Sequence, residues 1–230
     1  PYIPLPVLRG PLRGTWFILG SLAGPGGGAS VYFHKVEPEQ AEAVASILRP
    51  GDLFMDIGAN VGFYTILASK RVGRTGKVYA IEPFLRNLLL LSIHTKINRC
   101  SNVVVVPAAC ADISGIALFQ PGRNFAEGRI LSSADNADAT LKILPVPMIS
   151  IDDLCEKLSV CPSVLKIDVE GAELRVLQGA RETLRRCKPH LFISVHSEQL
   201  RGEVLSFLDE LGYRAEPIGK DNEFYASAIA

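Results

Sequence analysis

The sequence predicts an α/β fold in which a mostly parallel, doubly wound sheet is covered by helices on both faces. Short apolar runs alternate with amphipathic segments of helical period along most of the 230 residues, which is typical of parallel strands joined by crossover helices. Apolar side chains make up 48% of the chain, enough for one sizeable core in a single domain. The last two apolar runs are joined by the short polar stretch KDNE, which predicts a final strand that runs antiparallel.

Residues 1–36 are rich in proline and glycine and are expected to form an N-terminal extension of the main domain, residues 37–230. Within the extension, residues 15–19 and 31–34 are long enough for two short strands. A helix is expected over residues 37–48, because apolar side chains recur there at helical spacing and Pro50 follows.

Five apolar runs are expected to form parallel strands, and all but the third are followed directly by a helical pattern. The helix after the fourth run is expected to continue to about residue 187, and the helix after the fifth covers 198–211. The runs are 52–58, 77–83, 102–109, 163–171 and 190–196.

The alternation breaks over about residues 113–149, which we interpret as an insertion. Residues 116–119 and 143–149 can pair as a hairpin, and the polar segment 120–142 between them has the length of a lid. Side chains that could close over a bound acceptor are Arg123, Asn124, Phe125, Glu127 and Arg129.

The charge and cysteine content narrow the class of partner and the compartment. Lysine plus arginine and aspartate plus glutamate number 24 each, so no global field favours nucleic acid or an anionic membrane. No apolar run approaches the roughly 20 residues of a membrane span.

The five cysteines form no C-x-x-C pair, so we expect reduced thiols without a disulfide or zinc framework, and a cytoplasmic location. The chain starts at Pro1 and not at a methionine, so the sequence does not decide whether a targeting segment precedes it.

A glycine-containing turn, MDIGANVGFYT, follows the first parallel strand, at the sheet edge where open α/β folds bind nucleotides. Gly58 and Gly62 have the spacing Gly-x-x-x-Gly, which differs from the G-x-G-x-x-G of dinucleotide enzymes. Glycine lets the backbone turn sharply and lets a ligand approach it closely. Asp56, directly before the turn, would repel a pyrophosphate and attract an amino group or a positive charge.

A second carboxylate, Glu82, ends the next strand about twenty residues further on, where an acidic side chain can bind both hydroxyls of a ribose. A nucleoside that carries a positive charge and no diphosphate fits this pair, which indicates S-adenosyl-L-methionine. A purely structural turn with a capping aspartate is the alternative. The expected cofactor-binding residues are Asp56, Gly58, Ala59, Asn60, Gly62, Phe63, Thr65, Glu82, Pro83 and Asp168.

Four segments, FMDIGANVGFYTILAS, AIEP, ISIDDL and LKIDVEGAELRVLQGA, together resemble the FkbM-type family of S-adenosylmethionine-dependent methyltransferases. The similarity covers roughly residues 40–196. It implies a class I methyltransferase fold of seven strands with the last antiparallel. It also implies methyl transfer to oxygen, most often a hydroxyl of a sugar, polyketide or other small metabolite. The sequence departs from the family at Ser194, near which many relatives carry a glutamate.

Three carboxylates, Asp168, Glu170 and Glu173, follow the fourth parallel strand. In a doubly wound sheet this strand lies next to the first, which places Asp168 beside the reactive end of the methyl donor. An alcohol acceptor must lose its proton, so Asp168 is the expected base, His196 is the second candidate, and Glu170 completes the catalytic set. Alternatively, Asp168, Glu170 and His196 could hold Mg²⁺ or another divalent ion, although no metal is the main expectation.

Several of these residues also have structural interpretations. Glu170 and Glu173 suit the first turn of a helix, and Asp152 and Asp153 suit the cap of the helix that follows them. Lys166 could face the donor or pair with a carboxylate. His94, in a surface helix, and His190 are expected to be structural. The candidate substrate-binding residues are Glu173, Lys166, Arg123, Phe125 and Arg129.

The sequence therefore favours an O-methyltransferase that acts on a small hydroxylated molecule. A methyltransferase acting on RNA or protein is an alternative, for which Arg71, Arg74 and Lys77 form a local basic patch. A nicotinamide-dependent oxidoreductase is disfavoured, because G-x-G-x-x-G is absent and Asp56 is present. A nucleoside-binding module without catalysis is the remaining alternative.

Overall fold

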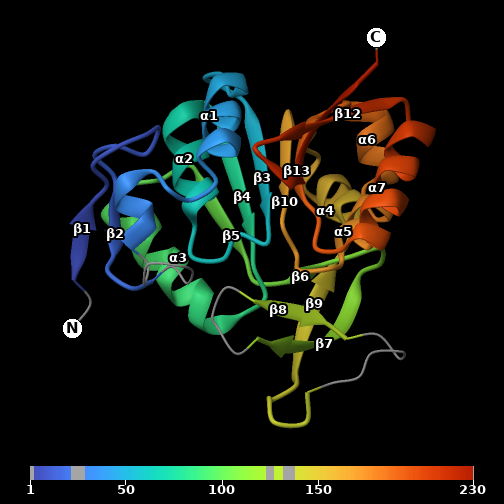
Figure 1. Ribbon diagram of the computed structural model, residues 1–230, viewed down its shortest axis with the longest axis horizontal. Helices are drawn as coiled ribbons and strands as arrows, with labels where there is room; N and C mark the ends of the chain where they lie inside the picture. The colour runs from blue at the N-terminus through green and yellow to red at the C-terminus, as the bar shows by residue number, and fades with distance from the viewer. Residues whose placement is uncertain (1–2, 22–28, 123–126, 132–137, 230) are drawn as a thin grey trace.

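The computed structural model describes residues 3–21, 29–122, 127–131 and 138–229, which are built around a mixed seven-stranded sheet (Figure 1). The strand order is β12-β13-β11-β10-β3-β4-β5. All neighbours are parallel except β13, which is antiparallel to both β11 and β12, so the expected fold is confirmed. The strands are β3 (Leu53–Ile57), β4 (Lys77–Ile81), β5 (Val103–Val106), β10 (Val164–Ile167), β11 (His190–Ser194), β12 (Tyr213–Ile218) and β13 (Lys220–Ala228).

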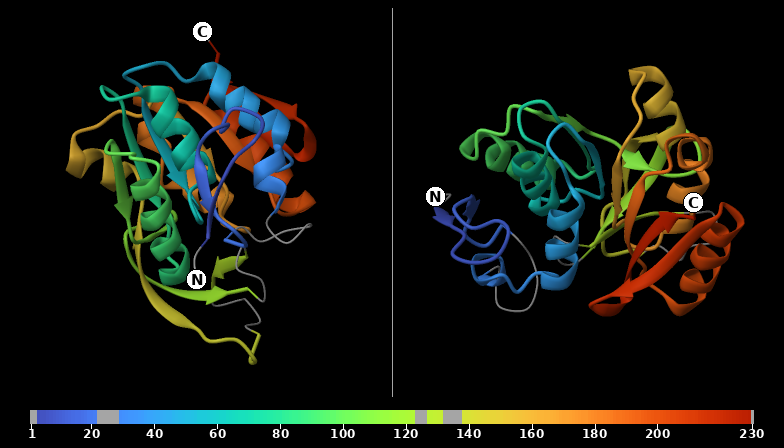
Figure 2. Two further views of the ribbon diagram at one scale, coloured as in Figure 1. Left: turned by 90° about the vertical axis from the view of Figure 1, so that its left-hand side faces the viewer. Right: turned by 90° about the horizontal axis from the view of Figure 1, so that it is seen from above.

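Helices cover both faces of this sheet (Figure 2). Successive strand side chains point to opposite faces, so both faces carry apolar side chains that the helices bury. Phe54 packs in a core cluster with residues of α1 and α2, whereas Met55 and Ile57 pack in a second cluster with residues of α4 to α7. The helices are α1 (Pro38–Ile47), α2 (Phe63–Val72), α3 (Leu85–Ile97), α4 (Ile151–Leu158), α5 (Glu173–Gln178), α6 (Arg181–Cys187) and α7 (Glu198–Glu210).

The single helix expected up to about residue 187 is instead two short helices, α5 and α6, and the capping prediction for α4 was wrong. Ser150 is the N-cap of α4 and accepts a hydrogen bond from the backbone N–H of Asp153, 3.1 Å away. Asp152 accepts instead from the backbone N–H groups of Glu182 and Thr183, at 3.1 and 2.7 Å. Its carboxylate therefore stabilises the start of α6, which explains why a second helix begins there.

The insertion forms a second sheet of order β6-β9-β7-β8, drawn below the main sheet in Figure 1. β7 (Gly115–Pro121) and β9 (Leu144–Ile149) pair antiparallel, as expected. β6 (Ala109–Cys110) pairs parallel with β9. Part of the expected lid is a strand, β8 (Gly128–Ile130), paired with β7. Arg123, Asn124 and Phe125 lie outside the described residues.

The N-terminal extension contains a two-stranded antiparallel sheet of β1 (Pro4–Pro6) and β2 (Trp16–Ile18). Residues 31–34 were expected as a strand, but a 3₁₀ helix covers Ala29–Phe33. β2 pairs with β1 instead. β1 was not expected from the sequence because it contains two prolines, and within sheets proline is mostly confined to edge strands. Val31 and Tyr32 are thereby free to pack into the core cluster that includes α1 and α2.

A buried histidine ties the extension to α3. The backbone N–H of Ile18 donates to Nε2 of His94 over 3.0 Å, and Nδ1 of His94 lies 2.7 Å from the carbonyl oxygen of Val61. Nδ1 therefore carries the proton, and the ring is neutral. The expectation of a surface position for His94 was wrong, because the extension covers this side of the helix and buries the ring completely.

A disulfide bond joins Cys161, before β10, to Cys187, the last residue of α6. Their Cα atoms lie 5.6 Å apart, within the usual range. The expectation of reduced thiols throughout is therefore wrong for this pair, while Cys100, Cys110 and Cys155 are free and buried. Among the described residues, no helix is both long enough and apolar enough to cross a membrane.

We expect the double variant Cys161→Ser/Cys187→Ser to unfold with a free energy about 3 kcal/mol lower than the native chain, because the bond closes a loop across a separation of 26 residues. Urea denaturation under oxidising conditions measures this difference. A reductant should bring the native chain to the stability of the variant without affecting the variant. Equal midpoints under oxidising conditions would contradict the prediction.

We expect His94→Gln to remove part of the acid sensitivity of the fold. Burial lowers the pKa of His94 below its ordinary value of 6.5, so its contribution to stability is complete above that value and is lost as the pH falls below it. Glutamine can make both hydrogen bonds but does not titrate. Urea denaturation from pH 7 to pH 5 should show a smaller loss of stability for the variant, and parallel losses would count against this role of His94.

Candidate functional site

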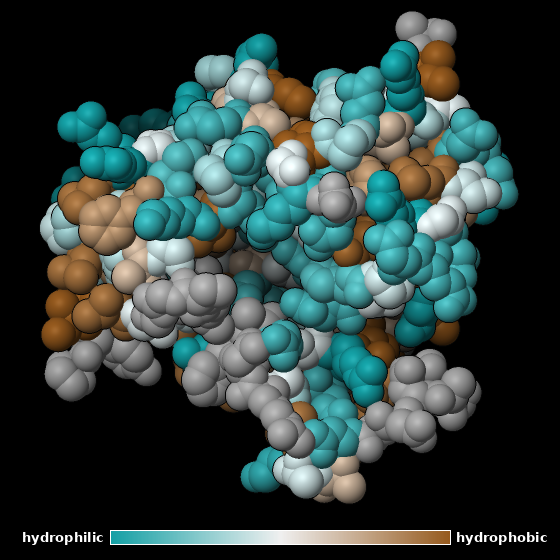
Figure 3. Space-filling model, in the orientation of Figure 1, coloured by the Kyte–Doolittle hydropathy of each residue, from teal (hydrophilic) through white to brown (hydrophobic). Residues whose placement is uncertain are grey.

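A cavity of about 360 Å³ lies at the carboxyl ends of the central strands, between the main sheet and the insertion. Seen in the orientation of Figure 1, the molecular surface has a hollow near its middle, with mostly hydrophilic residues on the right-hand side of the hollow (Figure 3). The cavity is at the predicted sheet edge and brings most of the candidate residues together. The candidates that line it are Asp56, Gly58, Ala59, Asn60, Phe63, Glu82, Pro83, Lys166, Asp168, Glu170 and His196.

The two glycines of the first turn are required by the packing of the chain on itself. Both have positive φ, +80° at Gly58 and +97° at Gly62. A Cβ at Gly58 would lie 1.8 Å from the carbonyl oxygen of Asp168, and a Cβ at Gly62 would lie 2.6 Å from a methyl of Leu91. Gly58 thus lets the ends of β3 and β10 meet, whereas Gly62 lets α3 pack and does not line the cavity.

Asp56 is a buried carboxylate at the end of β3, with only 2% of its surface exposed. Thr65 donates its hydroxyl to Oδ2 over 2.5 Å; Thr65 itself is fully buried and supports Asp56 from behind rather than lining the cavity. Burial raises the pKa of Asp56 to about 6, against the lowering effects of Thr65 and Lys166. A positively charged ligand group in the cavity would favour the ionised carboxylate.

Glu82 is held by donors from two turns. Its Oε2 accepts from the backbone N–H of Asn60, and its Oε1 accepts from that of Phe84, both over 2.9 Å. The side chain of Asn87 donates to Oε1 over 3.4 Å. Burial raises the pKa of Glu82 to about 7 in spite of these bonds. Oε2 accepts one hydrogen bond and keeps a lone pair for a ligand hydroxyl, so the pair of Asp56 and Glu82 fits the charged nucleoside expected from the sequence.

Lys166 is a fully buried amine on β10, where it both faces the cavity and pairs with a carboxylate. Its Nζ donates to Oγ of Ser194 over 2.9 Å and lies 3.3 Å from Oδ2 of Asp168 and 5.1 Å from the centre of the Tyr64 ring. Burial alone would lower the pKa of Lys166, but the surrounding carboxylates, Asp168 foremost, raise it above its ordinary value.

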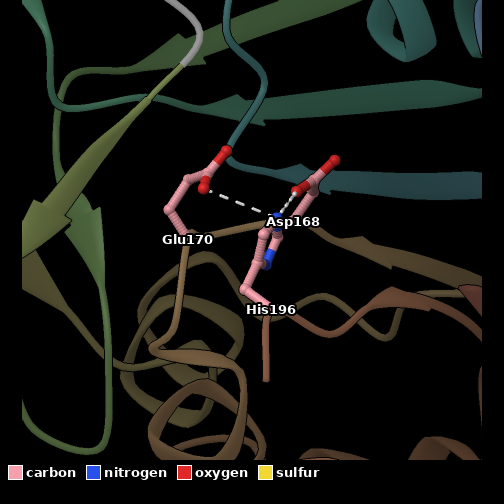
Figure 4. A group of neighbouring side chains, drawn as sticks. All are labelled: Asp168, Glu170 and His196. Atoms are coloured by element: carbon pink, nitrogen blue, oxygen red, sulfur yellow. Dashed lines mark ion pairs between the residues drawn. The ribbon is translucent and has the colours of Figure 1, made fainter. Parts of the chain in front are cut away.

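His196, just after β11, lies among three carboxylates, two of which, Asp168 and Glu170, are drawn in Figure 4. Its Nε2 is 3.5 Å from Oδ1 of Asp168 and 3.5 Å from Oε2 of Glu170, and its Nδ1 is 2.8 Å from Oε1 of Glu173. Burial would lower the pKa of His196, but the bond to Glu173 and the other two carboxylates raise it to about 9. Burial also raises the pKa of Glu170 to about 7.

Glu173 lies behind this cluster, fully buried, and does not line the cavity. Its Oε1 also accepts from the backbone N–H of Gly171 over 3.0 Å, so the side chain holds both the turn and the imidazole. The structure therefore does not bring Glu173 to a substrate-binding position. Arg129 does not line the cavity, and Arg123 and Phe125 lie outside the described residues.

Several cavity residues were not found from the sequence. Tyr64 donates its hydroxyl to Oε2 of Glu37 over 2.7 Å. Glu223, on β13, lies opposite Ser194 because β13 returns beside β11. The antiparallel register of the last strand is the signal that could have identified it. The missed lining residues with polar side chains are Glu37, Tyr64, Asn87, Ser194, Lys220, Asn222 and Glu223, whereas Glu127, which was expected to close over an acceptor, does line the cavity.

Comparison with known proteins identifies the family. The model of the methyltransferase FkbM domain matches residues 56–215. Hexuronic acid methyltransferase AglP of Haloferax volcanii is 26% identical over 176 residues, which are 75% of this chain and 69% of that protein.

Solved structures agree with this result. A methyltransferase FkbM from Methylobacillus flagellatus KT superimposes with a TM-score of 0.51 at 20% identity, over 90% of this chain, which spans 56% of that one. A SAM-dependent O-methyltransferase from Thermotoga maritima gives 0.52 at 14% identity, over 85% of this chain and 66% of that one. These similarities show a class I methyltransferase fold. Since the family model matches well over half of the sequence, the chain belongs to the FkbM methyltransferase family.

Proposed function

We propose that this methyltransferase moves a methyl group from S-adenosylmethionine to a hydroxyl of a small metabolite, with a sugar as the favoured class of acceptor. One observation carries the proposal. A single cavity joins two buried carboxylates at the ends of β3 and β4, which suit a charged nucleoside, to Asp168, Glu170 and His196 at the ends of β10 and β11. The hexuronic acid named for the Haloferax relative supports a sugar acceptor.

The donor end uses Glu82 and Asp56. The hydrogen bonds that hold Glu82 leave it oriented for the two hydroxyls of a ribose. Asp56 attracts the amino group of the amino acid tail and favours a positive charge nearby. When bound, the donor supplies an electrophilic methyl group on a sulfonium. The SAM-dependent Thermotoga enzyme of the same fold supports this choice of donor.

The acceptor end uses the cluster around His196. In the proposed step the acceptor oxygen bonds to the methyl carbon, the carbon–sulfur bond breaks with its electron pair on sulfur, and Asp168 takes the hydroxyl proton. Lys166 holds Asp168 and Ser194 in place. Most of the rate increase is expected from positioning, with the base contributing roughly 10²- to 10⁴-fold.

Asp56→Asn and Glu82→Gln are each expected to weaken binding of S-adenosylmethionine and S-adenosylhomocysteine by roughly 10- to 100-fold, because each removes a charged hydrogen-bonding partner with little change of shape. Isothermal titration calorimetry measures the affinities. Asp52→Asn, at the opposite end of β3, is the matched control and should bind as the native chain does. Binding of NAD in preference to both nucleosides, or no binding of either, would overturn the proposed donor.

Asp168→Asn is expected to lower kcat with a hydroxylated sugar acceptor by roughly 10²-fold or more, because the amide cannot take the hydroxyl proton. Single-turnover assays with radiolabelled methyl donor separate this step from binding. The affinity for S-adenosylhomocysteine should stay within a few-fold of the native value, which also shows that the variant folds. An unchanged single-turnover rate would contradict the assignment of Asp168.

A further inference from the structure

The geometry around His196 has the form of a cation site. One oxygen of Asp168, one oxygen of Glu170 and one ring nitrogen of His196 all lie within 4.8 Å of one another (Figure 4). The two distances from Nε2 to the carboxylates are 3.5 Å, longer than the 2.7–2.9 Å of a charge-assisted hydrogen bond. Ligands about 2.1 Å from an octahedral ion lie about 3 Å apart when adjacent and about 4.2 Å apart when opposite, so both carboxylates would have to move closer for the three atoms to share one ion.

Glu173 gives a second, independent indication. Its Oε1 lies 2.8 Å from Nδ1 of His196, and an ionised carboxylate can only accept. Nδ1 therefore carries a proton, which leaves Nε2 facing the carboxylates of Asp168 and Glu170. A carboxylate behind a metal-binding histidine is the usual arrangement in metalloproteins. Glu173 is fully buried, and its Oε2 has no hydrogen-bond partner among the described residues.

The local charges favour a cation. Asp168, Glu170 and Glu173 surround His196, and Lys166 is the basic side chain that pairs with the cluster. Lys166 contacts Oδ2 of Asp168, which leaves Oδ1 directed toward His196. Without an ion, a second proton on the imidazole is the alternative compensation for these carboxylates. The two possibilities differ in a measurable way, because only one of them requires a metal.

We propose that Asp168, Glu170 and His196 bind one divalent cation of the Mn²⁺ or Mg²⁺ class, with Glu173 as the positioning residue that orients His196. Two carboxylate oxygens and one imidazole favour a hard ion of this kind. Its remaining coordination positions would hold water or oxygens of the acceptor. Binding of the ion stands on the geometry alone, whereas its contact with the acceptor rests on the proposed function. A hydroxyl bound to the ion would become more acidic, so a weaker base would suffice to take its proton.

The test is titration of the full chain with Mn²⁺ in the absence of nucleoside, followed by electron paramagnetic resonance. We expect one Mn²⁺ per chain, displaced by excess Mg²⁺, with a nitrogen coupling that His196→Gln removes. Glu170→Gln should weaken binding more than about tenfold, and Glu173→Gln roughly 10- to 100-fold. Asp52→Asn is the control and should bind as the native chain does. Circular dichroism and thermal unfolding, measured in parallel, show that each variant folds.

Absence of Mn²⁺ binding at millimolar concentration would overturn the inference, as would stoichiometric binding that Glu170→Gln and His196→Gln leave unchanged. The result is independent of the proposed function. Mn²⁺ bound at this cluster in a chain that binds no S-adenosylmethionine would keep the cation site and reject the donor. Methyl transfer that persists at full rate in a chelator, without Mn²⁺ binding, would keep the function and reject the site.

Discussion

The close approach of β3 and β10 is the constraint on which the site depends. The carbonyl oxygen of Asp168 occupies the space where a side chain at residue 58 would begin, so only glycine lets the two strand ends meet. The parallel register then places Lys166 directly opposite Asp56. As a result, the carboxylate that suits the donor and the cluster that suits the acceptor share one cavity, rather than opening on separate parts of the sheet edge.

Buried charge is the second feature that shapes the site. Lys166 is a fully buried cation whose partners, Asp168 and Ser194, come from the ends of neighbouring strands. A lone buried ammonium would be costly, but here nearby carboxylates offset the loss of water. In the same way, the carboxylate of Glu173 pairs with Nδ1 of His196 and orients its ring. The site is therefore a network in which each charged group is oriented by another, which suits a reaction that depends mainly on positioning.

The mostly parallel sheet, its antiparallel last strand and the placement of Asp56, Glu82 and Asp168 at strand ends follow from the sequence, because hydrophobic periodicity and strand-end position determine them. What the sequence did not reveal depends on contacts between distant segments. The pairing of Cys161 with Cys187 and the burial of His94 require knowing how helices pack on their neighbours. The sequence places Glu173 in the first turn of a helix, but it gives no sign of the contact between Glu173 and His196, which is 23 positions away.

The crystal structure of the complex with S-adenosylhomocysteine tests the central claim most directly, because the claim concerns how one cavity orients a donor toward an acceptor site. We expect the ribose hydroxyls on Glu82, the amino group near Asp56, and the sulfur directed toward the space between Asp168 and His196. A nucleoside bound elsewhere, or bound in the cavity with its sulfur directed away from that space, would contradict the assignment of the two ends.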